Sequence, residues 1–315
     1  MTTSSPNLIW KDYVATNTSF SKEIPGLQIA WDSTSLGALK ECPRKYFYVV
    51  ILGLGAKEEN VHLRFGIEYH SALEDYDHER AAGKDHEEAT RKCIHNLLIN
   101  SQSFVSDDHY KNRDTLVRTV AWYLEEFKED PAKTVILANG KAAVELSFKL
   151  DFDVKSITNE DYLVCGHLDR LVEFQGSKWI LDRKTTKSGL YPEYFEKYSP
   201  NPQMSQYTYA GNVVLNQNVK GIIIDAAQVG VNFSRFQRGI TYRDQAQLAE
   251  WRHDTISYIK QAEGYAEQEY WPMNDKSCDN YGGCTFRSIC SKSPSVRETF
   301  LGNLHQRQWD PMVPR

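Results

Sequence analysis

The chain has 315 residues, of which 41% are hydrophobic and 25% are charged. These values exclude a collagenous, coiled-coil or wholly disordered protein, and the length suits two domains or one elaborated α/β domain. The formal net charge of −5 means that any contact with nucleic acid must come from a local basic surface. No apolar stretch approaches the roughly 20 residues of a membrane span, and the start of the chain lacks a signal-peptide pattern, so we expect a soluble protein that is not exported.

The patterning predicts a helical first half followed by a β-rich region. Residues 1–30 mix Ser, Thr, Asn and Pro and are expected to form a flexible arm. From residue 35 to about 130 the apolar residues recur with a helical period, and Pro131 ends that run. The period then becomes two over residues 144–152, which predicts a strand with one buried face.

Two more strands are expected at residues 162–172 and 178–185, joined by a short Gly-containing connection that suits a hairpin. A helix around residues 203–215 and a short apolar run at residues 221–227, typical of a central strand, follow. Asp244 is placed to cap a last long helix.

The predicted hairpin carries two acids and a lysine. Asp182 and Lys184 share one strand face because side chains alternate, and the hairpin can bring Asp169 beside them. Two carboxylates on a partly buried sheet repel each other unless a cation lies between them, and such oxygen ligands suit Mg²⁺ or Mn²⁺. With Lys184 stabilising developing charge, the chemistry indicated is phosphodiester hydrolysis. Solvated charges at strand ends explain the same short pattern equally well.

The sequence resembles the RecB-like branch of the PD-(D/E)XK nuclease superfamily on four elements in family order. They are Gly66-x-x-x-His70, Gly166-x-x-Asp169, Asp182-x-Lys184 and Gln203-x-x-x-Tyr207. The resemblance implies an α/β (α+β) fold of the restriction-endonuclease type, in which a central mixed β-sheet is flanked by helices.

The resemblance also implies roles for these residues. His70, Asp169 and Asp182 would bind the metal, Lys184 would be catalytic, and Gln203 and Tyr207 would line the DNA-facing side of the site. Ordinary helix packing explains Gln203 and Tyr207 too, and Gln206 with Tyr209 offers an alternative register. Two further residues have open roles: Glu145 is either a further acid of the site or a solvated strand residue, and His167 is a candidate for substrate contact.

Three cysteines, Cys278, Cys284 and Cys290, lie within thirteen residues near the end of the chain. Thiolates bind zinc or iron–sulfur clusters, and either site usually needs four ligands. Cys42 precedes a Pro-Arg-Lys-Tyr-Phe-Tyr run that resembles the iron–sulfur members of the same branch, the AddB-type and CRISPR-associated exonucleases. The resemblance implies a 4Fe-4S cluster on these four cysteines, although the C-x5-C-x5-C spacing departs from the usual C-x2-C-x5-C and leaves zinc as the alternative.

We therefore expect a metal-dependent DNA nuclease that works as an exonuclease or end-processing enzyme, because nothing suggests a separate base-reading module. Arg170, Arg183, Lys184 and Lys187 are expected to contact the phosphate backbone. The absence of a Walker A motif indicates that the chain has no motor of its own. A helicase or recombination protein is the expected partner besides DNA, with no membrane contact, in the cytoplasm of a bacterial or phage-infected cell.

Two other functions fit the same residues. A non-catalytic DNA-binding recombination accessory protein would retain the fold and the cluster as a scaffold, and a metal hydrolase of small phosphoesters would turn over nucleotides without preferring DNA. The predicted division of the chain is a flexible arm at residues 1–30, a helical region at 31–135, a nuclease core at 136–270 and a cysteine-cluster segment and tail at 271–315.

Overall fold

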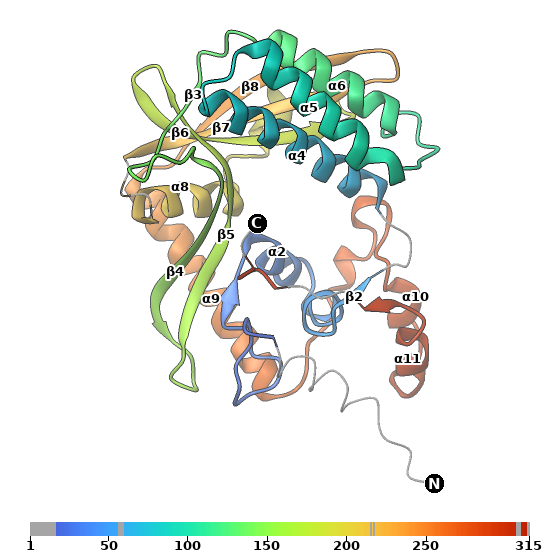
Figure 1. Ribbon diagram of the computed structural model, residues 1–315. Coiled ribbons are helices and arrows are strands. Elements are labelled where there is room, and N and C mark those ends of the chain that lie inside the picture. Colours follow the sequence, from blue (N-terminus) through green and yellow to red (C-terminus); the bar gives the residue numbers. More distant parts are fainter. Residues whose placement is uncertain (1–16, 56–59, 215, 217, 307–309, 314–315) are drawn as a thin grey trace. The chain divides into compact units, whose positions relative to one another are not determined.

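The structure is a computed structural model that describes residues 17–55, 60–214, 216, 218–306 and 310–313. It contains a mixed sheet of seven strands, with β1, β5, β6, β7 and β8 in that order and with β3 and β4 also pairing with β5. Helices flank the sheet, which confirms the predicted fold class (Figure 1). No helix in the described ranges combines the length and the apolar character that a membrane span requires.

The chain divides into two compact units, each assembled from separate stretches. Unit 1 comprises Met1–Glu58, Lys149–Gly166 and Ala249–Pro314, and unit 2 comprises Glu59–Phe148 and His167–Leu248. The long strands β4 (Val144–Lys155) and β5 (Asp161–Phe174) run from one unit into the other. Separate stretches come together in each unit because pairing along long strands joins residues that are distant in the sequence.

Unit 2 is a three-layer arrangement around the second half of β5 and three further long strands (Figure 1). Its strands are β3 (Lys133–Thr134), β6 (Ser177–Thr186), β7 (Val219–Val229) and β8 (Ser234–Tyr242). Its helices are α4 (Val61–Ala81), α5 (His86–Asn100), η2 (Ser101–Ser103), α6 (Arg113–Glu126), α7 (Pro192–Glu196) and α8 (Pro202–Val214).

Strand pairing in unit 2 follows from the lengths of the connections. β5 and β6 are antiparallel and joined by the predicted hairpin, whose turn residues Gln175 and Gly176 have φ angles of 50° and 69°. Positive φ at both positions is what a two-residue hairpin turn of type I′ requires. β6 and β7 are parallel, so the chain crosses over through α7 and α8 before β7 begins.

Opposite faces of β6 meet different helices. Gly211 of α8 packs so closely on the sheet that a Cβ atom there would crowd Ile180 and Val219. On the other face the apolar sides of α4, α5 and α6 form a hydrophobic core together with Ala227 and Val229 of β7. Even-numbered residues of β6 therefore face α8, and odd-numbered residues face α4 and α6.

Unit 1 contains the remaining elements. Its helices are α2 (Ser33–Glu41), α3 (Pro43–Tyr46), η1 (Phe47–Ile51), α9 (Gln245–Glu267, whose first turn lies in unit 2), η3 (Asp275–Ser277), η4 (Asn280–Gly282), α10 (Arg287–Cys290) and α11 (Pro294–Leu301). Its short strands are β1 (Ala30–Trp31), β2 (Leu54–Gly55) and β9 (His305–Gln306). Asp244 caps α9 as predicted, since its carboxylate accepts a hydrogen bond from the Gln247 amide at 2.8 Å.

The predicted N-terminal arm is folded in its described part. Residues 1–16 lie outside the described residues. From Asn17 onward the chain packs against unit 1: Phe20 bridges to Gln28, and Phe20 and Leu27 are buried. Burial of these isolated apolar residues makes the folded part begin earlier than the sequence pattern indicated.

Candidate functional site

The two acids of the hairpin lie opposite each other in unit 2. Arg170 pairs with Leu181, so Asp169 and Asp182 occupy the next step of the same antiparallel ladder. Both carboxylates are buried, and the backbone N–H of Arg183 donates a hydrogen bond to Asp169 Oδ2 at 2.8 Å. The hairpin register therefore brings two like charges to one place on the sheet.

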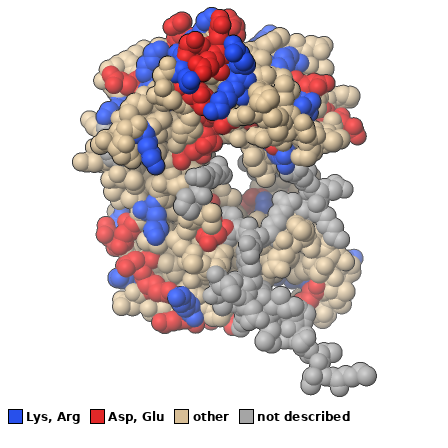
Figure 2. Space-filling view, viewed as in Figure 1, with Lys and Arg blue, Asp and Glu red and all other residues tan. Residues whose placement is uncertain are grey.

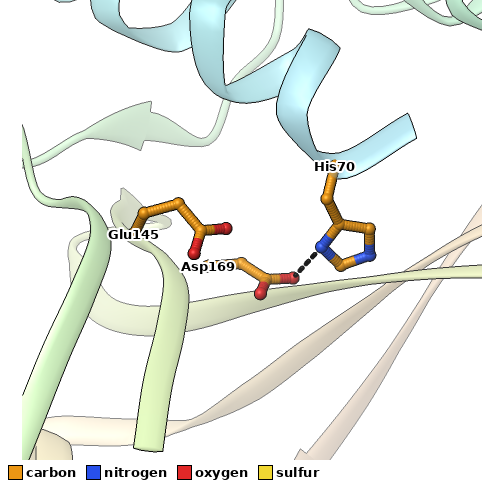
Figure 3. Close-up of side chains that lie close together, drawn as sticks. All are labelled: His70, Glu145 and Asp169. Carbon is orange, nitrogen blue, oxygen red and sulfur yellow. Dashed lines mark ion pairs between the residues drawn. The ribbon is translucent and has the colours of Figure 1, made fainter. Parts of the chain in front are cut away.

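His70 of α4 and Glu145 of β4 complete a group around Asp169 (Figure 3). His70 Nδ1 lies 3.3 Å from Asp169 Oδ2. One potential ligand atom from each of His70, Glu145 and Asp169 lies within 4.8 Å of the other two, and no other such group of three occurs among the described residues. One imidazole and two carboxylates are donors that Mn²⁺ and Mg²⁺ accept.

Glu145 is the residue that the sequence pattern left open. Its backbone has a φ angle of 45°, a left-handed conformation that is uncommon for a residue with a side chain and that disturbs the regular alternation of β4. Figure 3 shows its carboxylate directed toward Asp169. Nothing in the alternating pattern signals this, because a regular strand would simply place Glu145 on the solvated face.

Lys184 connects the acids to α8. Its ammonium lies 2.7 Å from Asp182 Oδ2 and donates a hydrogen bond to Gln203 Oε1 at 3.3 Å. The Gln203 amide in turn donates to the Tyr207 hydroxyl at 3.2 Å. Two pairs on α8 fit the sequence motif, Gln203 with Tyr207 and Gln206 with Tyr209. The structure places the first pair in the hydrogen-bonded chain that starts at Lys184. The roles assigned to these residues stay predictions, including that of Asp182, which lies outside the three-residue group of Figure 3.

The acids of the pair differ in their proton affinity. Burial raises the pKa of Asp169, but the neighbouring His70 and then Lys184 outweigh it and hold this pKa well below its ordinary range. Burial raises the pKa of Asp182, and Lys184 offsets this only in part while the charge of Asp169 adds to it. Burial lowers the pKa of His70, yet Asp169 raises it above its ordinary value. Asp169 is therefore the firmly ionised acid of the pair.

The expectation that Arg170 and Arg183 contact DNA is wrong. Their side chains are only 9% and 3% exposed, and both pair with Asp77 of α4. They follow Asp169 and Asp182 by one residue, so strand alternation turns them to the face covered by α4 and α6.

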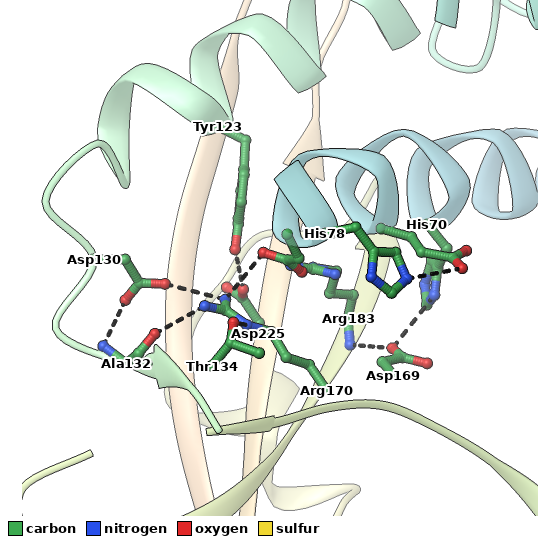
Figure 4. A network of polar contacts seen from close by, with 12 residues as sticks. His70, His78, Tyr123, Asp130, Ala132, Thr134, Asp169, Arg170, Arg183 and Asp225 are labelled. Carbon is green, nitrogen blue, oxygen red and sulfur yellow. Dashed lines mark hydrogen bonds and ion pairs between the residues drawn. The ribbon is translucent and has the colours of Figure 1, made fainter. Parts of the chain in front are cut away.

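Figure 4 shows the buried network that these arginines enter. Arg170 also pairs with Asp130, and Arg238 pairs with Asp130 at 2.6 Å and with Asp225 at 3.2 Å. The Tyr123 hydroxyl donates a hydrogen bond to Asp225. The network supports the back of the strands that carry the acids.

His167 and Lys187 are not part of the group of His70, Glu145 and Asp169. His167 Nδ1 lies 2.9 Å from the Ser147 hydroxyl. Lys187 is exposed and lies over the ring of Tyr110, 5.5 Å from its centroid. Both therefore remain candidates for substrate contact.

The four predicted cluster cysteines come together within unit 1. Cys42 lies between α2 and α3, and its sulfur accepts a hydrogen bond from the Asn274 amide at 3.3 Å. Ser277 and Asn274 both donate to the carbonyl of Glu41, which holds the segment before Cys278 against Cys42. The amide of Cys284 donates to the carbonyl of Cys278 at 2.9 Å.

The surroundings of these thiols are apolar on one side. Cys284 and Cys290 pack against a small core of Tyr48, Phe286 and Ile289. Burial raises the pKa of Cys278, and the nearby Cys284 and Cys42 raise it further. The cysteines thus lie close enough to influence one another although 236 residues separate Cys42 from Cys278 in the sequence.

Cys93 and Cys165 are different. Both are fully buried outside this cluster, and burial raises the pKa of Cys93 to about 12. Both pack as small hydrophobic residues.

Comparison with known proteins identifies the family. A search of curated proteins gave no match. Among solved structures, a "Putative exonuclease" from Eubacterium rectale is 11% identical, with 80% of this chain and 86% of that chain covered and a TM-score of 0.49. The structure of SSO0001 is 14% identical, with 90% and 95% covered and a TM-score of 0.32. A sequence model of the PD-(D/E)XK nuclease superfamily matches residues 31–291, which is most of the chain. The protein therefore belongs to the PD-(D/E)XK nuclease superfamily.

Proposed function

We propose that this protein is a divalent-metal-dependent deoxyribonuclease that degrades or processes DNA from its ends. The observation that carries the proposal is the group of His70, Glu145 and Asp169 beside the Asp182–Lys184 ion pair. A metal-binding group next to an ammonium is the arrangement that phosphodiester hydrolysis needs, since negative charge develops on the phosphoryl oxygens in the transition state.

The residues present fit a divalent cation. His70, Glu145 and Asp169 would hold it, and when bound it would polarise a phosphoryl oxygen and lower the pKa of a water molecule. Lys184 is kept protonated by its acidic neighbours: burial lowers its pKa, but Asp182 and Asp169 raise it above its ordinary value. A permanent ammonium can stabilise charge on the phosphate, and Gln203 fixes its direction.

The proposal is tested with linear DNA labelled at one end and with covalently closed circular DNA of the same sequence. In Mg²⁺ or Mn²⁺ we expect the linear DNA to be degraded and the circle to persist, and EDTA should stop the reaction. DNA binding without cleavage in either metal would favour the accessory protein, and turnover of nucleotides alone would favour a small-phosphoester hydrolase.

We further propose that Cys42, Cys278, Cys284 and Cys290 hold a 4Fe-4S cluster. Four sulfurs are gathered within unit 1, which is the usual complement of such a cluster. A tetrahedral zinc site on the same four sulfurs is the alternative.

Cys278→Ser should abolish the iron and sulfide content of anaerobically purified protein. Cys93→Ser, which changes a buried cysteine of unit 2, should leave that content unchanged. Iron, sulfide and zinc analysis with a visible spectrum measures both. We expect Cys278→Ser to loosen the segments that carry Cys42 and Cys290, because a metal site closes the very long loop between them. Stoichiometric zinc in the parent protein would contradict the cluster.

A further inference from the structure

A short segment between β6 and α8 borders the Lys184 side of the site. It consists of α7 and the loop to Asn201, and neither its composition nor its period marks it as functional. Tyr194 and Tyr198 of this segment are buried, with their hydroxyls 3.3 Å apart. Burial raises the pKa of Tyr194, while Tyr198 and the Lys184 ammonium oppose the rise, which places this ring within the field of Lys184.

Two contacts with β8 and the residue after it fix the segment. Phe195 lies against Gly239, where a Cβ atom would overlap its ring, so glycine is needed for this close approach. The buried guanidinium of Arg243 donates to the carbonyl of Tyr198 at 2.7 Å and to that of Asn201 at 3.4 Å. The segment is therefore held by packing and hydrogen bonds on both sides of residue 197.

Lys197 is the exposed cation that this segment presents. Its ammonium lies 3.7 Å from the ring centroid of Tyr194 and 5.0 Å from that of Tyr198. Lys197 forms no ion pair with any residue in the described ranges, whereas Lys184 has Asp182. The rings hold the ammonium in place, since cations are attracted to aromatic faces, but they leave its charge unneutralised.

The segment that carries Lys197 lies on the same face of the sheet as Asp182 and Lys184, because Phe195 packs on Gly239, Gly239 pairs with Ile224, and Ile224 pairs with Asp182. Burial lowers the pKa of Lys197, and the charge of Lys184 lowers it further. The ammonium groups of Lys184 and Lys197 repel each other in the free protein, and an anion that binds to both reduces this repulsion. Their arrangement therefore favours an anionic ligand with more than one charged group. A nucleic-acid backbone has this property, because each strand carries one phosphate per 3.4 Å or so of duplex axis.

We propose that Lys197, held over Tyr194 and Tyr198, binds the backbone phosphate that neighbours the scissile one. This inference rests on the proposed nuclease function and deepens it by adding a substrate contact. Lys197 supplies charge to a phosphate that does not react, and the two buried rings fix the position of its ammonium. The subsite would set the register of the strand without reading its sequence.

Lys220 provides a matched control for the test. It is also an exposed lysine over an aromatic ring, 5.8 Å from the centroid of Trp179. It follows Val219, which pairs with Lys178, while Lys184 pairs with Ala226. Lys220 and Ala226 are six residues apart on strand β7, which is about 20 Å along the strand at its usual rise per residue. Lys220→Gln therefore removes the same charge from a place remote from the site.

The first measurement is the salt dependence of oligonucleotide binding in EDTA, where no metal-dependent cleavage occurs. For Lys197→Gln we expect the slope of log K against log salt to fall in magnitude by about 0.7 to 0.9, the value for one lost phosphate contact. Lys197→Arg should restore the slope, and Lys220→Gln should leave it unchanged. An equal change in Lys197→Gln and Lys220→Gln would overturn the proposal.

The second measurement locates the phosphate. Oligonucleotides with a single neutral methylphosphonate at successive positions should show one position where the parent protein loses affinity and Lys197→Gln does not. Identical profiles for both proteins would overturn the subsite. Because binding is measured without cleavage, a parent protein that binds DNA but never degrades it would contradict the nuclease proposal while leaving this test intact.

Discussion

Asp169→Asn is expected to lower metal-dependent DNA cleavage by about a thousandfold, the effect of losing several kcal/mol of transition-state stabilisation. Asp169 contacts His70 on one side and the backbone of β6 through the N–H of Arg183, and it shares the metal-binding group with His70 and Glu145. Asparagine keeps an oxygen for that N–H but removes the charge that a cation needs. Single-turnover cleavage of end-labelled DNA measures the effect.

Glu173→Gln is the matched control for this prediction. Glu173 lies on the same strand four residues further on, and its side chain is exposed. Its substitution should leave cleavage within about twofold of the parent, because an exposed charge remote from the site contributes little. Cleavage by Asp169→Asn at the parent rate would remove Asp169 from the site, and equal losses in both variants would show that general charge is responsible.

Asp77→Ala should lower the free energy of unfolding by about 3–5 kcal/mol, the usual cost of leaving a buried charge without its partner. The Asp77 side chain is 3% exposed and pairs with Arg183, which is equally buried, and with Arg170 at 3.5 Å. Removing the carboxylate leaves two guanidinium groups on the buried face of the sheet with less compensation. Urea unfolding monitored by circular dichroism measures the change.

A neighbouring acid on α4 supplies the comparison. Glu74 pairs with His78 at 3.7 Å, and both side chains are at least 35% exposed. Glu74→Ala should therefore cost less than about 1 kcal/mol, as exposed ion pairs usually do. Asp77→Asn should fall between the two, because the amide can still accept hydrogen bonds from the arginines. If Asp77→Ala costs no more than Glu74→Ala, the network does not stabilise the fold.

Local patterns in the sequence were enough for most elements. The alternation over residues 144–152, the Gly-containing turn and the Asp244 cap each depend on neighbouring residues, and β4, the β5–β6 hairpin and α9 form as predicted. β8 had no such signal. Its residues mix polar and charged side chains, and its position depends on pairing with β7 and on the ion pairs of Arg238.

The candidate site likewise combines residues whose positions follow from local strand alternation and residues whose positions depend on packing between distant segments. Strand alternation correctly placed Asp182 and Lys184 on one face, and it also implied that Arg183 lies on the other. What alternation cannot say is which face a helix will cover, so the burial of Arg170 and Arg183 against Asp77 became evident only from the packing of α4. Glu145 and Lys197 were hidden for the same reason, because their positions depend on a left-handed backbone and on contacts with other elements.

The sequence by itself determined the family, the order of most elements and the residue types of the chemistry, since motif spacing and periodicity are properties of short stretches of chain. Only the tertiary structure decided which charges meet one another, which are buried, and that Cys42 approaches a segment more than 230 residues away. These outcomes depend on strand register and helix packing between distant segments, and no local pattern of residues records them.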